Sequence, residues 1–170
     1  VRQPRQGHWF DSYQHVYLAI EHAAQFMQML ELAQLEMDSL ADGVHKYAQT
    51  WFRLDQRYRK FVYHARESGQ ATLLQALSQQ VENLYSNNYL SYLNVRWQRF
   101  VDGCERWDAS LVVSQAKFFE HFVQPYLERK GKVCVLISDA FRYEVGEELQ
   151  SLIRREDRFD AELVPALSCL

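Results

Sequence analysis

The sequence predicts a mainly helical chain, in which an antiparallel helical bundle is followed by the first β-α-β unit of an incomplete α/β domain. Through most of the first 129 residues, apolar side chains recur at three- and four-residue steps, which is typical of helices with one buried stripe. From residue 130 onward a continuous apolar run replaces this pattern. We therefore predict a helical domain over residues 1–129 and the start of an α/β domain over residues 130–170.

Four helices are expected in the first domain, and no strand is expected before Lys130. Short breaks between the helices favour antiparallel packing of neighbours. Ser68-Gly69 should end the second helix. The helices are predicted to run from about Trp9 to Met37, from Val44 to Arg66, from Ala71 to Val101 and from Ser114 to Arg129.

Each predicted helix has an apolar stripe that should face the core. The third segment can form one long helix, or the polar residues 86–88 can bend or split it, because their side chains compete for backbone hydrogen bonds. Pro125 should kink the fourth helix. The expected core positions include Tyr17, Ile20 and Ala24, then Trp51, Leu54 and Phe61, then Leu74, Val81 and Asn88, and finally Phe118, Phe122 and Tyr126.

The segment Val133–Ile137 is a continuous run of β-branched and apolar residues, which suits a strand buried on both faces of a parallel sheet. Helical spacing follows to about Arg155, and a second strand is expected to begin at Phe159. A strand, a helix and a second strand in this order form a right-handed crossover unit. One such unit cannot bury its own faces, so we expect the sheet to continue in a longer parent protein.

Asp139 directly follows the predicted strand. In open α/β sheets, ligands bind beyond the carboxyl ends of the strands, and a carboxylate there can coordinate a divalent metal ion. The alternative is that Ser138 or Asp139 caps the next helix by accepting hydrogen bonds from its first backbone N–H groups. The residues alone leave both interpretations open.

A family resemblance covers about the last quarter of the chain. Residues 132–149 combine a hydrophobic strand, the string S-D-A-F-R-Y-E and an acidic helix, and this stretch resembles the start of the PglZ domain. Residues 159–163 and 167–170 are similar to the next strand and loop of that family. The upstream helices carry no sharp motif of their own.

The resemblance implies an alkaline-phosphatase-like fold and a place in bacteriophage-exclusion (BREX) systems, with other phage-defence proteins as partners. It implies that Asp139 is a ligand of a catalytic divalent metal (zinc, manganese or magnesium) in a phosphatase or phosphodiesterase-like parent. The nucleophile and remaining ligands of such enzymes come later in the chain. We therefore assign no catalytic residue, and expect this fragment to be inactive and to hold no metal.

A basic stripe of Arg53, Arg57 and Lys60 lies at helical steps on the second predicted helix. Such a face can neutralise phosphates, so a docking module that binds another defence protein or nucleic acid is the alternative function. The simpler interpretation is a solvated helix face. The histidines, including His15 and His22, are expected on helix surfaces.

The composition excludes several classes of protein. A net charge of −3 does not indicate whole-chain attraction to nucleic acid or to acidic membranes. The chain has three widely spaced cysteines, which fit reduced thiols in the cytoplasm. No apolar run is long enough to span a membrane. Phosphate-binding, dinucleotide-binding and esterase motifs are missing from the sequence. The first residue, Val1, suggests a piece of a longer chain.

Overall fold

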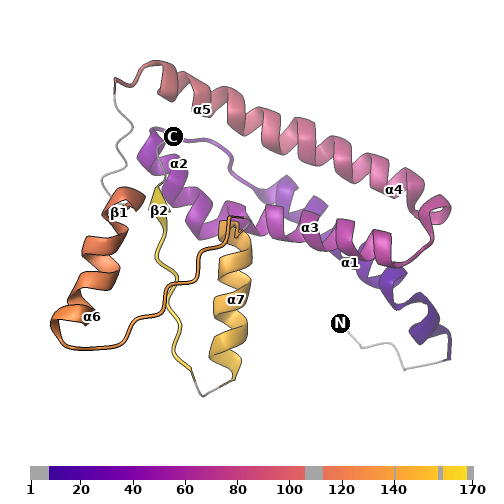
Figure 1. Ribbon diagram of the computed structural model, residues 1–170. Coiled ribbons are helices and arrows are strands. Elements are labelled where there is room, and N and C mark those ends of the chain that lie inside the picture. Colours follow the sequence, from indigo (N-terminus) through magenta and orange to yellow (C-terminus); the bar gives the residue numbers. More distant parts are fainter. Residues whose placement is uncertain (1–7, 106–112, 140, 157–158, 168–170) are drawn as a thin grey trace. The chain divides into compact units, whose positions relative to one another are not determined.

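The computed structural model describes residues 8–105, 113–139, 141–156 and 159–167. Most of these residues are helical, as the sequence predicted (Figure 1). The chain divides into two compact units, which we describe separately. The first unit is drawn from Val1–Glu36 and Thr50–Gln98, and the second from Met37–Gln49 and Arg99–Leu170.

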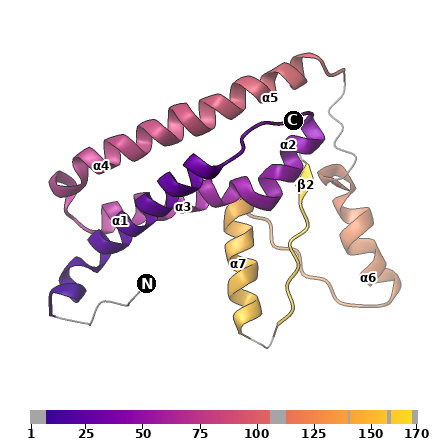
Figure 2. The same ribbon diagram turned by 180° about the vertical axis from the view of Figure 1, so that it is seen from behind.

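Three helical rods build the first unit. Helix α1 (His8–Leu32) packs along α3 (Phe52–Glu67), and α4 (Ala71–Asn83) packs against both. A π-helical segment (Leu84–Ser91) joins α4 to α5 (Tyr92–Asp102) without a break, so the third predicted helix is one long helix (Figures 1 and 2). Gly69, with a φ of 62°, follows α3 in the left-handed conformation that its predicted end required.

The buried face of α1 differs from the predicted stripe by one position. Tyr17 and Ile20 are 53% and 47% exposed, and Ala24 is also exposed. The predicted stripe was wrong because it followed the largest side chains. Small residues on the neighbouring stripe let α1 and α3 approach closely. The buried side chains among residues 13–32 of α1 are Val16, Ala19, Ala23 and Phe26.

The other predicted stripes are confirmed in part. Trp51, Leu54 and Phe61 are buried, and so are Leu74 and Val81. Beyond Val81 the buried position moves by one residue, from the predicted Asn88, which is exposed, to Tyr89, which is 1% exposed. A π-helical segment has more residues per turn than an α-helix, so it rotates the side chains that follow. The polar residues 86–88 lie in this segment.

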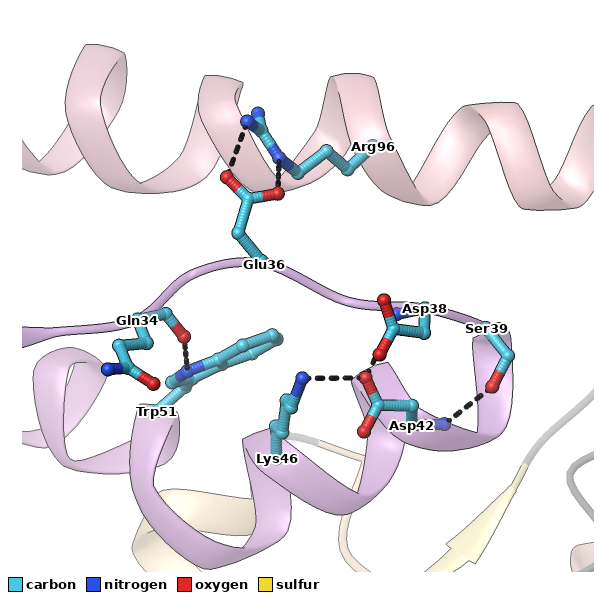
Figure 3. Close-up of polar contacts among 8 residues, drawn as sticks. All are labelled: Gln34, Glu36, Asp38, Ser39, Asp42, Lys46, Trp51 and Arg96. Carbon is cyan, nitrogen blue, oxygen red and sulfur yellow. Dashed lines mark hydrogen bonds and ion pairs between the residues drawn. The ribbon is translucent and has the colours of Figure 1, made fainter.

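The segment after α1 is held by polar contacts within the first unit (Figure 3). The prediction of helix as far as Met37 was wrong, since α1 ends at Leu32. The guanidinium of Arg96 on α5 binds both carboxylate oxygens of Glu36, at 2.9 and 3.0 Å. The indole N–H of Trp51 donates to the carbonyl of Gln34 at 3.2 Å. These contacts hold the extended chain against two helices.

In the second unit, α2 (Leu40–Lys46) begins earlier than the predicted Val44, because Ser39 caps it. The Ser39 hydroxyl accepts a hydrogen bond from the backbone N–H of Asp42 at 3.1 Å (Figure 3). The Asp42 carboxylate in turn accepts from the N–H of Asp38 and pairs with Lys46. A π-helical segment (Tyr47–Trp51) continues α2 toward α3.

The predicted fourth helix is broken into short pieces. It comprises a 3₁₀ turn (Gln115–Lys117), a π-helical turn (Phe119–Val123) and α6 (Gln124–Glu128). Pro125 lies in the first turn of α6, where its missing N–H costs no helical hydrogen bond. Phe118 and Tyr126, expected in the core, are 43% and 57% exposed, whereas Val123 is buried.

A two-residue strand precedes this region, contrary to the expectation of none before Lys130. Strand β1 (Val113–Ser114) pairs in parallel with β2 (Ala166–Leu167), in the register Val113 to Ala166 and Ser114 to Leu167. Only the tertiary fold brings these distant segments together, so no local pattern could have revealed this pairing.

Helix α7 (Tyr143–Arg155) is confirmed, but the strands predicted on either side of it are not formed. Val133–Ile137 has no regular secondary structure, and Leu136 and Ile137 are 92% and 88% exposed. Residues 159–163 are likewise irregular. A strand is stabilised by pairing with a neighbour, and in the described part of the chain no strand pairs with either segment.

Helix α7 packs on the segments around it. A Cβ at Gly146 would lie 3.1 Å from Leu163 and 3.3 Å from Phe141, so glycine permits this close approach. The side chains of Gln150 and Arg154 both donate to the carbonyl of Ala161. Among the described helices, none is long and apolar enough to cross a membrane.

Candidate functional site

Asp139 lies in the turn that leads into α7, and its side chain is exposed. The turn is closed by a hydrogen bond from the backbone N–H of Phe141 to the carbonyl of Ser138, at 3.4 Å. The carboxylate is therefore at the surface of the second unit, where a ligand can reach it.

The capping interpretation of Ser138 and Asp139 is wrong. Helix α7 begins at Tyr143, its N-cap residue is Arg142, and no side chain caps it by a hydrogen bond. The two residues lie one turn too early in the chain to reach the first free N–H groups of the helix. Asp139 is thus not occupied as a cap, and its role as a metal ligand stays a prediction.

The described residues do not by themselves fit a complete metal centre. Among them, no three His, Cys, Asp or Glu side chains gather in a way that could hold a metal ion. Asp139 offers one carboxylate, whereas hard divalent cations take about six oxygen ligands. A metal held by Asp139 would need further ligands from outside this set.

Tyr143 of the S-D-A-F-R-Y-E string ties α7 to the rest of the second unit. The phenol of Tyr143 donates to the carbonyl of Ala48 at 3.1 Å, and its ring packs edge-on to Tyr47. Burial, reinforced by Glu147, raises the pKa of the Tyr143 phenol. Glu144 is 1% exposed. The burial of Glu144 was not predicted from the sequence.

The basic stripe (Arg53, Arg57 and Lys60) lies along α3 in the first unit. Its spacing places all three side chains on one helix face. Arg53 is exposed, and Arg57 and Lys60 are half-buried. The guanidinium of Arg57 approaches the Nδ1 atom of His22 at 3.5 Å. The stripe is therefore continuous with groups that α1 contributes.

A histidine cluster of His15, His22 and His64 adjoins this stripe and was not anticipated. The Nδ1 atoms of His15 and His64 are 2.9 Å apart, and the rings of His22 and His64 stack with centroids 5.4 Å apart. The seven-residue spacing of His15 and His22 was the available signal. Its meaning depended on α3 bringing His64 alongside, which the sequence does not reveal.

Both His22 and His64 resist protonation. Burial lowers the pKa of His22, and the nearby Arg57, His64 and Lys60 lower it further. Burial also lowers the pKa of His64, with contributions from His15 and Lys60. The pKa falls for the same reason at both histidines, because protonation would place a positive charge on a partly buried ring.

A groove of about 450 Å³ lies between α3 and α4. Phe61 and Leu74 are among its apolar lining residues, and Arg66 and Glu82 are among its polar lining residues. None of the sequence-predicted site residues lines it, so it is separate from both candidate sites.

Comparison with known proteins identifies the region around Asp139. Residues 118–170 match the family described as the BREX system PglZ alkaline phosphatase-like domain. The chain belongs to the PglZ family. The resemblance inferred from the S-D-A-F-R-Y-E string is thereby confirmed, and the match begins upstream of it, within the broken fourth helix.

Two curated relatives extend the likeness to nearly the whole chain. The alkaline phosphatase-like protein PglZ of Bacillus cereus is 32% identical over 164 residues, which cover 94% of this chain and 19% of that protein. The alkaline phosphatase-like protein BrxZ of Escherichia coli is 34% identical over 175 residues, covering 96% and 20% respectively. This PglZ-family chain thus spans about a fifth of the length of these relatives. No solved structure matches it.

Proposed function

We propose that this chain serves a metal-dependent phosphatase or phosphodiesterase-like protein of a bacteriophage-defence complex, and that Asp139 supplies one ligand to its divalent metal. The supporting observation is the PglZ-family match over residues 118–170, which includes Asp139. Zinc, manganese and magnesium are the candidate ions. Other proteins of the defence complex are the proposed partners, and the cytoplasm is the proposed location.

The geometry around Asp139 supports this role. Its carboxylate is exposed, and it is not engaged as the cap of α7. In the longer protein we propose that Val133–Ile137 pairs with neighbouring strands, completing the first β-α-β unit after an antiparallel helical bundle. The exposed Leu136 and Ile137 side chains would be buried in that sheet. Asp139 would then lie at a strand end, where ligands gather.

The 170-residue chain by itself is proposed to be inactive, since one carboxylate cannot hold a catalytic ion. The test uses the full-length protein with Asp139→Asn and, as a control, Asp160→Asn, an exposed aspartate on the segment after α7. Metal content by elemental analysis and phosphodiesterase turnover should both fall for Asp139→Asn alone. Undiminished metal content and turnover in that variant would remove Asp139 from the site.

The second candidate function is docking of nucleic acid on the first unit by the basic stripe. The supporting observation is that Arg53, Arg57 and Lys60 share one face of α3 and that this face continues into the histidine cluster. Lysine and arginine neutralise phosphates without regard to sequence, so binding should weaken steeply as salt rises.

Fluorescence anisotropy with labelled single-stranded DNA tests this second function. The triple variant Arg53→Gln, Arg57→Gln, Lys60→Gln should lose binding. The slope of the logarithm of its affinity against the logarithm of the salt concentration should be reduced by roughly one per cation removed. The control removes three cations of the second unit, Lys117, Arg129 and Lys130, and should bind as the unaltered chain does. Equal losses in both variants would indicate attraction by overall charge and would exclude a defined face.

A further inference from the structure

The histidine cluster is the feature of the first unit that the proposed functions leave unexplained. His15 and His22 extend from α1, and His64 extends from α3 to meet both. Their rings contact one another in sequence, with centroids 5.1 Å apart for His15 and His64 and 5.4 Å for His22 and His64. Three proton-binding groups therefore stand together beside two permanent cations of the basic stripe, Arg57 and Lys60.

The contact between His15 and His64 requires that one ring nitrogen carries a proton and the other does not. Two imidazoles whose Nδ1 atoms lie 2.9 Å apart share one hydrogen bond, in which one donates and the other accepts. Protonating both rings would set two N–H groups against each other. The cluster in its ligand-free form thus favours neutral histidines.

The charged groups around the cluster are of both signs. On α1, Glu21 raises the pKa of His22, and on α3, Glu67 raises that of His64. Arg57 and Lys60 act in the opposite direction. Helix α4 also packs against α1 and α3, and its Glu82 acts on Tyr58. An added anion would therefore favour protonation of this cluster.

A ring suitable for stacking lies at the same place. Tyr63 is 54% exposed, and its ring meets that of His64 edge-on with centroids 5.0 Å apart. Aromatic rings beside a positively charged groove are typical of proteins that bind single-stranded nucleic acid, because each base can stack on them. This arrangement favours a single strand over a duplex, whose bases are already stacked.

We infer that the histidine cluster and the basic stripe together bind the phosphodiester backbone of a single-stranded nucleic acid, and that this binding tightens as the pH falls. The inference rests on the second candidate function and adds the regulation of that site. The phosphate is the counter-ion that lets His22 and His64 accept protons while Arg57 remains beside them. By linkage, any ligand that favours the protonated form binds more tightly when protons are abundant.

The experiment measures the affinity of the 170-residue chain for a labelled oligothymidylate at constant ionic strength and at about pH 7.5, 6.5 and 5.8, values that bracket histidine titration. We expect affinity to rise by about tenfold or more over this range, since each linked proton can contribute up to tenfold per pH unit. The variant His22→Gln, His64→Gln should bind with little pH dependence. The control His45→Gln, His121→Gln, which changes exposed histidines of the second unit, should keep it.

Inorganic pyrophosphate provides a measurement that needs no variant. In NMR titrations of the unaltered chain, pyrophosphate should raise the pKa values of His22 and His64, and it should leave the chemical shifts of the His121 ring unchanged. Unmoved titration of His22 and His64 would overturn the inference, even if the oligonucleotide binds. Circular dichroism of each variant establishes that its helices are intact.

The two proposals fail in different ways. If the basic-stripe variant loses oligonucleotide binding while the histidine variant keeps the full pH dependence, the docking function stands and the inference is wrong. If the unaltered chain does not bind the oligonucleotide at any of these pH values, both are wrong.

Discussion

The phenol of Tyr143 donates a hydrogen bond to the backbone carbonyl of Ala48, at 3.1 Å and across 95 residues of sequence. Tyr143 belongs to the string by which the PglZ resemblance was recognised, and Ala48 lies in the π-helical segment that follows α2. The bond therefore anchors the start of α7, and with it the turn that holds Asp139, to another helix of the second unit.

Tyr143→Phe should lower the free energy of unfolding of the second unit by about 1 kcal/mol, the usual net value of one hydrogen bond. The variant keeps the ring and its contact with Tyr47. It therefore loses only the hydrogen bond to the carbonyl of Ala48. Urea denaturation measures the change. Tyr126→Phe, at a side chain that is 57% exposed, is the matched control and should be neutral.

Ser39→Ala should destabilise the second unit by about 1 kcal/mol, because it removes the N-cap of α2. Ser138→Ala is the matched comparison, since Ser138 precedes α7 without capping it. Thermal unfolding of the two variants checks the difference. A larger loss for Ser138→Ala than for Ser39→Ala would restore the capping role that the structure excludes.

Phe26→Ala should destabilise the first unit by about 3–5 kcal/mol, because it removes a large side chain from a close-packed core. Phe26 is 0% exposed and packs near Tyr58 and Tyr85. Leu32→Ala, on the same helix at 75% exposure, should change stability by less than about 0.5 kcal/mol. Denaturation monitored by circular dichroism compares them, and similar losses would contradict the assigned buried face of α1.

Acidification should weaken the first unit. The pKa values of His22 and His64 are lower in the folded chain than the ordinary value of 6.5. The unfolded chain therefore binds more protons as the pH drops below about 6.5, and the equilibrium shifts toward unfolding. Stability should be full above that pH and should decline until the folded histidines also titrate.

The urea concentration at the midpoint of unfolding, determined at pH values between about 7.5 and 5, measures this decline. His22→Gln together with His64→Gln should flatten the pH dependence, whereas His45→Gln, outside the first unit, should leave it unchanged. A steeper decline in the double variant would contradict the assigned direction of the pKa values.

The glycine signal in the sequence specified local structure correctly, because it acts through its own backbone. Gly69 adopts the positive φ that ends α3. Pro125 was expected to kink the fourth helix, and it instead lies in the first turn of α6. The long helical stretches and α7 were likewise predictable from apolar periodicity. The string around Asp139 determined the family, which the comparisons confirmed.

Tertiary structure decided which side chains those helices bury and which distant residues meet. On α1, small residues such as Ala19 and Ala23 face α3 instead of the larger Tyr17, because helix packing depends on close fit as well as on hydrophobicity. The π-helical segment shifted the buried position to Tyr89, a change that no helical period encodes.

Contacts between distant segments also decide the candidate sites. A strand requires partners, so the apolar run Val133–Ile137 could not become one from its own residues. His15, His22 and His64 form a cluster only because α1 and α3 lie side by side. Sequence determined the helices and the family of this chain through local and motif information, whereas contacts between distant segments, which have no local signature, were decided by the fold alone.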